Sequence, residues 1–141
     1  MSKQFSDLGI SAPILKSLAD LNIAVPTEIQ NKTIPLLLNN TDDFVGLAKT
    51  GTGKTAAFGL PLLQLIDLDN ENIQGVILVP TRELGQQIFS NMEAYATYLP
   101  KISIAATCGG TPIKPQIERL TEATHIVIAT PGRLIDLIKR K

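Results

Sequence analysis

One eight-residue segment constrains the fold of this chain more than any other, because it combines two closely spaced glycines with a lysine and a threonine. The segment reads Ala48-Lys49-Thr50-Gly51-Thr52-Gly53-Lys54-Thr55. It fits the phosphate-loop pattern, with alanine in the first glycine position. An apolar run precedes it and a stretch with helical spacing follows it, which is the strand and helix context that such a loop requires.

Each residue type in this loop has a physical reason to contact a polyphosphate. Gly51 and Gly53 permit positive φ, so that backbone N–H groups can turn toward phosphate oxygens. We predict that Lys54 reaches the β- and γ-phosphates and that the Thr55 hydroxyl binds Mg²⁺ together with the nucleotide, which makes both candidate catalytic residues. The structural alternative is a glycine-rich turn with a solvent lysine. The predicted nucleotide-binding residues here are Lys49, Thr50, Gly51, Thr52, Gly53, Lys54 and Thr55.

Short apolar runs alternate with stretches of helical spacing along the chain. Runs that are apolar at nearly every position suit strands buried on both faces, and the alternation predicts an α/β fold with a parallel sheet and helices on both faces. The predicted strands are 44–48, 75–79, 102–106 and 125–129, and the helices between them are 54–66, 82–98 and about 112–121. Two more helices are expected near 11–21 and 27–38, and a last one begins near Pro131.

Composition limits the class of protein further. The chain has 141 residues, of which 44% are hydrophobic, and this predicts one compact domain. With 13 basic and 13 acidic residues, any contact with nucleic acid must come from placed groups. The single cysteine, Cys108, and the single histidine, His125, argue against a disulfide or a zinc site, and we interpret both as structural. Without a signal sequence or a membrane-length apolar run, the chain is expected to be soluble and cytoplasmic.

Four further phrases carry specific residue types. The first, ahead of the loop, is Asn22-Ile23-Ala24-Val25-Pro26-Thr27-Glu28-Ile29-Gln30, with Phe5 upstream; the others follow predicted strands and are Pro80-Thr81-Arg82-Glu83-Leu84-Gly85-Gln86-Gln87, Gly109-Gly110 and Thr130-Pro131-Gly132-Arg133. Each has a structural alternative. Thr27 and Gln30 fit a helix capping box, Thr81 and Thr130 are good helix N-caps, and two glycines suit an ordinary turn.

Together with the phosphate loop, these phrases resemble the motifs of DEAD-box ATP-dependent RNA helicases, from Phe5 to Arg133. The resemblance implies a RecA-like P-loop fold in which Gln30 pairs with adenine and Phe5 stacks on it, so that ATP is the nucleotide. A primary amide can match the adenine edge and mismatch guanine. The chain departs from the family where Asn22 replaces a glycine, Ile23 an aromatic residue, Glu28 a frequent proline and Gly85 an alanine.

The resemblance also implies a path for RNA along the carboxyl ends of the strands. Backbone N–H groups, threonine hydroxyls and arginines there can hold phosphates and 2′-hydroxyls without reading bases, so binding is expected to be independent of sequence. The residues implied in RNA contact are Pro80, Thr81, Arg82, Gly109, Gly110, Thr130, Gly132 and Arg133.

The family's D-E-A-D and S-A-T motifs do not occur in these 141 residues. We therefore predict a partial first RecA-like domain, incomplete on its C-terminal side, with residues 1–40 as the adenine-reading region and 41–141 as the phosphate-loop sheet region. The parent protein is expected to couple ATP hydrolysis to RNA unwinding, and this fragment only to bind nucleotide and weakly hold RNA. An open sheet edge beside the phosphate-loop strand predicts dimerisation. The alternatives are a non-hydrolysing nucleotide- or RNA-binding module and a small-molecule phosphotransferase.

Overall fold

The computed structural model describes residues 3–39 and 43–140, so the proposed boundary between residues 40 and 41 lies outside the described residues. The chain forms two compact units. The first comprises residues 1–65 and 94–100, and the second comprises residues 66–93 and 101–141.

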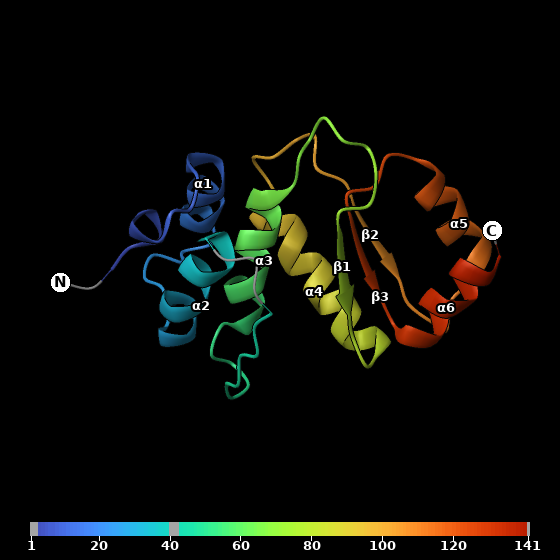
Figure 1. Cartoon of the computed structure of the whole chain (residues 1–141), viewed down its shortest axis with the longest axis horizontal. Helices are drawn as coiled ribbons and strands as arrows, with labels where there is room; N and C mark the ends of the chain where they lie inside the picture. The colour runs from blue at the N-terminus through green and yellow to red at the C-terminus, as the bar shows by residue number, and fades with distance from the viewer. Residues whose placement is uncertain (1–2, 40–42, 141) are drawn as a thin grey trace. The chain divides into compact units, whose positions relative to one another are not determined.

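The first unit is helical. It contains the short 3-10 helix η1 (Phe5–Leu8) and the helices α1 (Ala12–Asp20), α2 (Glu28–Asn39) and α3 (Lys54–Leu65), drawn in blue to green in Figure 1. Helices α2 and α3 pack against each other. Fully buried aliphatic side chains from all three α-helices form the core of this unit, and they are Ile14, Leu18, Ile34 and Leu60.

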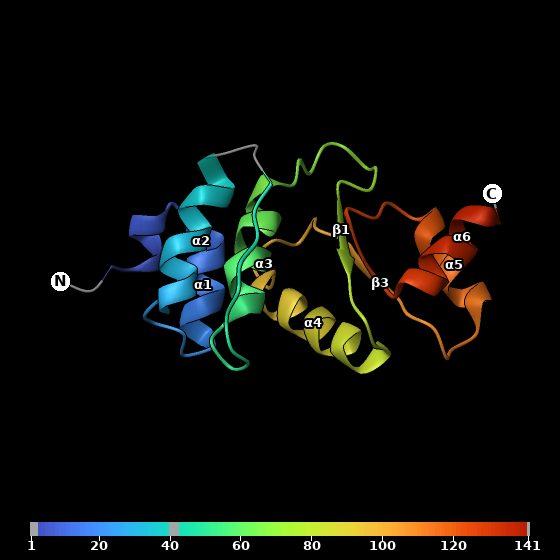
Figure 2. The same ribbon diagram turned by 60° about the horizontal axis from the view of Figure 1, so that its bottom comes forward.

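The second unit is built on a parallel sheet. Its strands are β1 (Gly75–Leu78), β2 (Ile104–Thr107) and β3 (Ile126–Ala129), in the order β1-β3-β2. Its helices are most of α4 (Arg82–Tyr95), α5 (Ile113–Thr121) and α6 (Pro131–Lys139). Figures 1 and 2 both show α4 on one side of the strands and α5 and α6 on the other. This confirms the predicted α/β class and its parallel sheet with helices on both faces.

The central strand and the outer strand β1 differ in how well they are covered. The central strand β3 is buried at every position, as its continuously apolar sequence predicts. In β1, Ile77 is buried, whereas Val76 and Leu78 on the opposite face remain 51% and 57% exposed. The described sheet therefore has an apolar outer strand at one edge.

The predicted strand 44–48 is wrong. Residues 43–49 have no regular structure, and Val45 and Leu47 are 84% and 91% exposed. A strand needs hydrogen bonds from a neighbouring strand, and every strand in the described part of the chain lies downstream and pairs within the second unit. A continuously apolar run favours a strand that is buried on both faces. The strand forms only where neighbouring strands are present to pair with it.

The remaining predicted elements are confirmed, with shifts at their ends. Helix α4 stops at Tyr95 rather than near residue 98, and β2 begins two residues later than predicted. His125 has the structural role expected of it, since its buried imidazole Nδ1 accepts a hydrogen bond from the Ser103 N–H at 3.0 Å. None of the helices in the described part of the chain is long and apolar enough to cross a membrane.

Candidate functional site

The loop before α3 has the backbone that phosphate binding requires. Gly51 and Gly53 have φ of +77° and +84°, a region that other residues rarely adopt. Lys54 is the first residue of α3, and its Nζ donates to the Ala48 carbonyl at 2.5 Å. The lysine amino group is thus folded over the loop, at the positive end of a helix.

Gln30 joins the start of α2 to this loop. Its side chain is only 3% exposed. The amide oxygen accepts from the Thr27 N–H at 2.9 Å, and the amide nitrogen donates to the Gly53 carbonyl at 3.0 Å. The Thr27 hydroxyl donates to the Thr52 carbonyl at 2.8 Å. Only one of the two hydrogen bonds of the predicted capping box is therefore formed, the one from the Thr27 N–H to the Gln30 amide oxygen. The Thr27 hydroxyl and the Gln30 amide nitrogen donate to the loop instead.

Gly53 is required for this contact as well as for the turn. A Cβ on residue 53 would lie 2.3 Å from Gln30 Nε2 and 3.4 Å from the Thr27 hydroxyl oxygen. Only a residue without a side chain lets the loop approach α2 this closely.

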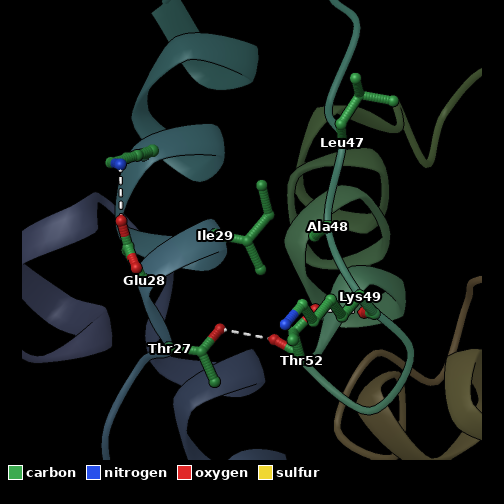
Figure 3. Close-up of a pocket in the computed structure, with 8 residues that line it drawn as sticks. Thr27, Glu28, Ile29, Leu47, Ala48, Lys49 and Thr52 are labelled. Carbon is green, nitrogen blue, oxygen red and sulfur yellow. Dashed lines mark hydrogen bonds and ion pairs between the residues drawn. The ribbon is translucent and has the colours of Figure 1, made fainter.

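A cavity of about 460 Å³ opens beside the loop (Figure 3). On its α2 side, Glu28 and Lys32 form an ion pair of 2.7 Å, and the hydrogen bond from Lys32 lowers the pKa of the Glu28 carboxyl. The residues lining the cavity are Thr27, Glu28, Ile29, Lys32, Leu47, Ala48, Lys49 and Thr52. Two of the predicted nucleotide-binding residues, Lys49 and Thr52, are among them.

Phe5 is not among the lining residues. It is 3% exposed within η1 and instead lines a smaller cavity of about 250 Å³ with Leu15, Leu18 and Ile23. The structure therefore brings Gln30 to the phosphate loop but keeps the Phe5 ring in the core of the first unit.

The position of Thr55 is compatible with the predicted role of its hydroxyl as a ligand of Mg²⁺. Thr55 is the second residue of α3 and half-buried, and Thr50 is exposed in the loop before it. No group of three or more His, Cys, Asp or Glu side chains that could hold a metal ion occurs among the described residues. A hydroxyl oxygen is a suitable hard ligand for Mg²⁺, which commonly takes few protein ligands and the remainder from phosphates and water.

A second polar cluster lies in the sheet unit, where the three parallel strands end. The Thr130 hydroxyl, after β3, accepts from the Gly109 N–H, after β2, at 3.1 Å. Arg82, after β1, donates to the Gly110 carbonyl at 3.3 Å, and Gly110 has φ of +82°. The three motifs thus meet at one edge, as the parallel sheet predicts.

The two threonines of this cluster differ in role. Thr81 is a side-chain N-cap, because its hydroxyl accepts from the Leu84 N–H at 3.3 Å. Thr130 occupies the N-cap position of α6 but makes no capping bond with its side chain, which is bonded to Gly109 instead. The capping alternative therefore accounts for Thr81 and not for the side chain of Thr130. Pro80 and Gly132 are exposed at the same strand ends.

Arg133 lies in a network that the sequence did not reveal. Its guanidinium donates to Gln116 Oε1 at 2.7 Å and to the Thr111 carbonyl at 2.8 Å. Gln116 Nε2 in turn donates to the Thr111 hydroxyl at 2.8 Å and to the Cys108 carbonyl at 3.0 Å. No motif contains Gln116, and no sequence signal separates it from the other polar residues of α5.

Two departures from the motifs have local explanations. Asn22, where a glycine is usual, has φ of +57°, and asparagine is the side chain that best tolerates this region after glycine. Gly85, where alanine is usual, faces Cys108, whose sulfur would lie 2.6 Å from an added Cβ. Burial raises the pKa of the Cys108 thiol.

Comparison with known proteins agrees with this class of fold. The family model described as DEAD/DEAH box helicase matches residues 27–141. The chain belongs to this family. It is 44% identical over 136 residues to the ATP-dependent RNA helicase DeaD of Escherichia coli, and 44% identical over 141 residues to the RNA helicase CrhR of Synechocystis.

Solved structures of the family have the same fold. A DEAD box protein from Methanococcus jannaschii matches 99% of this chain with a TM-score of 0.88 and 39% identity, over 38% of its own length. Dbp5 of S. cerevisiae, bound to RNA and ADP BeF3, matches 99% with a TM-score of 0.87 and 28% identity, over 34% of its length. The chain spans 22% of DeaD and 28% of CrhR, although it is matched over 96% and 100% of its own length.

Proposed function

We propose that this chain is the ATP-binding and RNA-binding portion of an ATP-dependent RNA helicase that acts in the cytoplasm. The observation that carries the proposal is the phosphate loop, with two glycines at positive φ and a lysine at the start of α3, held from behind by Gln30. This arrangement offers backbone N–H groups, a cation and a helix N-terminus to one polyphosphate.

Gln30 retains the capacity to select adenine. A primary amide has two N–H donors and two acceptor lone pairs. One donor is used by Gly53 and one lone pair by Thr27, which leaves one of each for a base edge. Guanine presents two acceptors, O6 and N7, at this edge, so the free acceptor of Gln30 has no donor to pair with there and the free pair favours ATP over GTP.

The other members of the site have narrower roles in this proposal. Thr55 would bind Mg²⁺ together with the phosphates, and the ion would neutralise charge that develops when the terminal phosphoryl group leaves. Lys54 would neutralise the same phosphates. Phe5 would stack on adenine only after its ring becomes accessible, since the ring is buried.

RNA would bind at the carboxyl ends of the strands. Arg82, Arg133 and the exposed glycines Gly110 and Gly132 offer charge and close backbone approach, which suit phosphates and sugars rather than bases. The Dbp5 structure that this chain resembles contains RNA, which supports the proposal. The parent protein would couple hydrolysis of ATP to local unwinding, whereas these 141 residues would bind both ligands without hydrolysing ATP.

Because residues 43–49 form no strand, the open sheet edge that we propose for pairing between two copies of the chain is that of the outer strand β1. The N–H groups of Gly75 and Val79 donate toward β3, so those of Val76 and Leu78 point to the open edge. The exposed side chains of Val76 and Leu78 are apolar. Light scattering should therefore detect a dimer that Val76→Lys dissociates and the control Ile138→Lys, at another exposed apolar site, does not. A monomeric unmodified chain at high concentration would exclude dimerisation.

A titration with a fluorescent ATP analogue and Mg²⁺ tests the nucleotide site. ATP should bind more tightly than GTP, and both Lys54→Ala and Gln30→Ala should weaken ATP binding about tenfold or more, since each removes a group at the loop. Lys101→Ala and Gln86→Ala, at exposed positions, serve as matched controls. If ATP and GTP bind equally well and Gln30→Ala leaves ATP affinity unchanged, Gln30 acts only as a helix cap and does not select adenine.

A further inference from the structure

Gln116 occupies the centre of the polar network at the strand ends, although it belongs to none of the motifs there. All its bonds run to residues that follow β2 or β3. The carboxamide oxygen accepts a hydrogen bond from Arg133, and the carboxamide nitrogen donates to both the Cys108 carbonyl and the Thr111 hydroxyl. The orientation of the amide is fixed, because only its nitrogen can face the Cys108 carbonyl and only its oxygen can face a guanidinium.

These contacts hold both the turn after β2 and the arginine of α6. The turn 108–111 is bonded at each end, since Gln116 donates to its first residue and Arg133 donates to the carbonyl of its last. Between these ends, Gly109 is held by Thr130 and Gly110 by Arg82. Gln116 is the residue that connects the guanidinium to the turn from the side of α5.

The bonds leave Arg133 able to bind an anion. A guanidinium has five N–H donors, and the two bonds observed use one on each terminal nitrogen. Three donors remain. Gln116 is neutral, so it orients the guanidinium without cancelling its charge, which a carboxylate in the same place would do.

We propose that Gln116 is a positioning residue for phosphate binding by Arg133. This inference rests on the proposed binding of RNA. Gln116 does not itself contact the RNA in this proposal; it reduces the number of orientations that Arg133 must lose on binding.

The test measures binding of a fluorescent single-stranded oligouridylate to the whole chain at several salt concentrations. Gln116→Met keeps the length of the side chain and removes all three bonds, so the association constant should fall about tenfold. The slope of log K against log salt should become shallower by up to about 0.7, the value for complete loss of one phosphate contact, because a less ordered Arg133 neutralises its phosphate less completely. Ile117→Met, at an exposed position of the same helix and outside the motifs, is the control and should leave both quantities unchanged.

A double-mutant cycle separates positioning from a general effect on the fold. If Gln116 acts through Arg133, Gln116→Met in the Arg133→Ala background should change RNA affinity by less than about twofold. Binding of the ATP analogue should be unaffected in every variant.

The possible failures point to different conclusions. No RNA binding by the unmodified chain at low salt would overturn the proposed function and this inference together. Weaker binding by Arg133→Ala with no effect of Gln116→Met would overturn the role of Gln116 alone. An equal loss from Gln116→Met in both backgrounds would also overturn it, because the residue would then support the fold rather than Arg133.

Discussion

Gly85→Ala should destabilise this protein even though the residue lies inside a helix. In an exposed helix position, replacing glycine by alanine stabilises by about 0.5–1 kcal/mol, because the unfolded chain loses freedom and the helix gains a better former. Here the new Cβ would lie 2.6 Å from Cys108 Sγ and 3.1 Å from Val79 Cγ2, both of them buried. Overpacking of a tight core costs about 1–3 kcal/mol.

The two effects oppose each other, and the clash is the larger one. We expect the free energy of unfolding to fall by up to about 2 kcal/mol, where propensity alone predicts a rise of about 1 kcal/mol. In a chain of this size, 1 kcal/mol corresponds to a shift in Tm of about 2–4 °C. Urea unfolding followed by circular dichroism would measure the change, with Gln86→Ala on the same helix as the propensity control.

A second substitution identifies the cause. Cys108→Ala removes the sulfur and should itself cost about 1 kcal/mol, as for other small deletions from a core. In that background Gly85→Ala should lose most of its penalty, since the nearest remaining atom is Val79 Cγ2. A coupling energy of about 1–3 kcal/mol is expected. A Gly85→Ala variant more stable than the original chain, or additivity of the two changes, would refute the reasoning.

Three further predictions each concern one residue. Asn22→Gly should raise the free energy of unfolding by a few tenths to about 1 kcal/mol and Asn22→Ala should lower it, because only the former relieves a positive φ; urea unfolding measures both. Burial raises the pKa of Tyr95, so its contribution is complete below about pH 10 and decreases as the pH rises through the folded-state pKa; Tyr95→Phe should flatten this alkaline loss in unfolding curves. Thr130→Val should cost about 1–2 kcal/mol by leaving the Gly109 N–H without its partner, and should weaken RNA binding in the assay above without changing ATP binding.

Local chemistry made parts of the fold predictable from the sequence. The strand β3 is apolar at every position and buried at every position, as predicted for a strand with two covered faces. The parallel topology predicts that the motifs after β1, β2 and β3 lie at one edge, and the contacts among them agree. The structural alternative for Thr81, a helix N-cap, also agrees with its hydrogen bond, whereas its predicted contact with RNA stays a prediction.

Features that depend on distant neighbours were not predictable in this way. The run 44–48 has the composition of a buried strand, but no described strand pairs with it. The sequence likewise did not show that the Thr130 hydroxyl bonds to Gly109 rather than capping its own helix. Nor did it show that Gln116 accepts a hydrogen bond from Arg133. Both contacts join residues 17 or more positions apart, where periodicity and capping rules carry no information.

The departures from the motifs indicate how this chain keeps the geometry while changing the residues. Asn22 preserves the left-handed backbone that a glycine would otherwise provide. Gly85 works in the opposite direction, since it gives up helix propensity to make room for the Cys108 sulfur. At position 22 the residue tolerates the backbone conformation, and at position 85 the residue leaves room for a neighbouring side chain. A residue that departs from a motif is therefore best judged by its φ and by the nearest buried atom, and by these measures Asn22 and Gly85 each suit the backbone at their position.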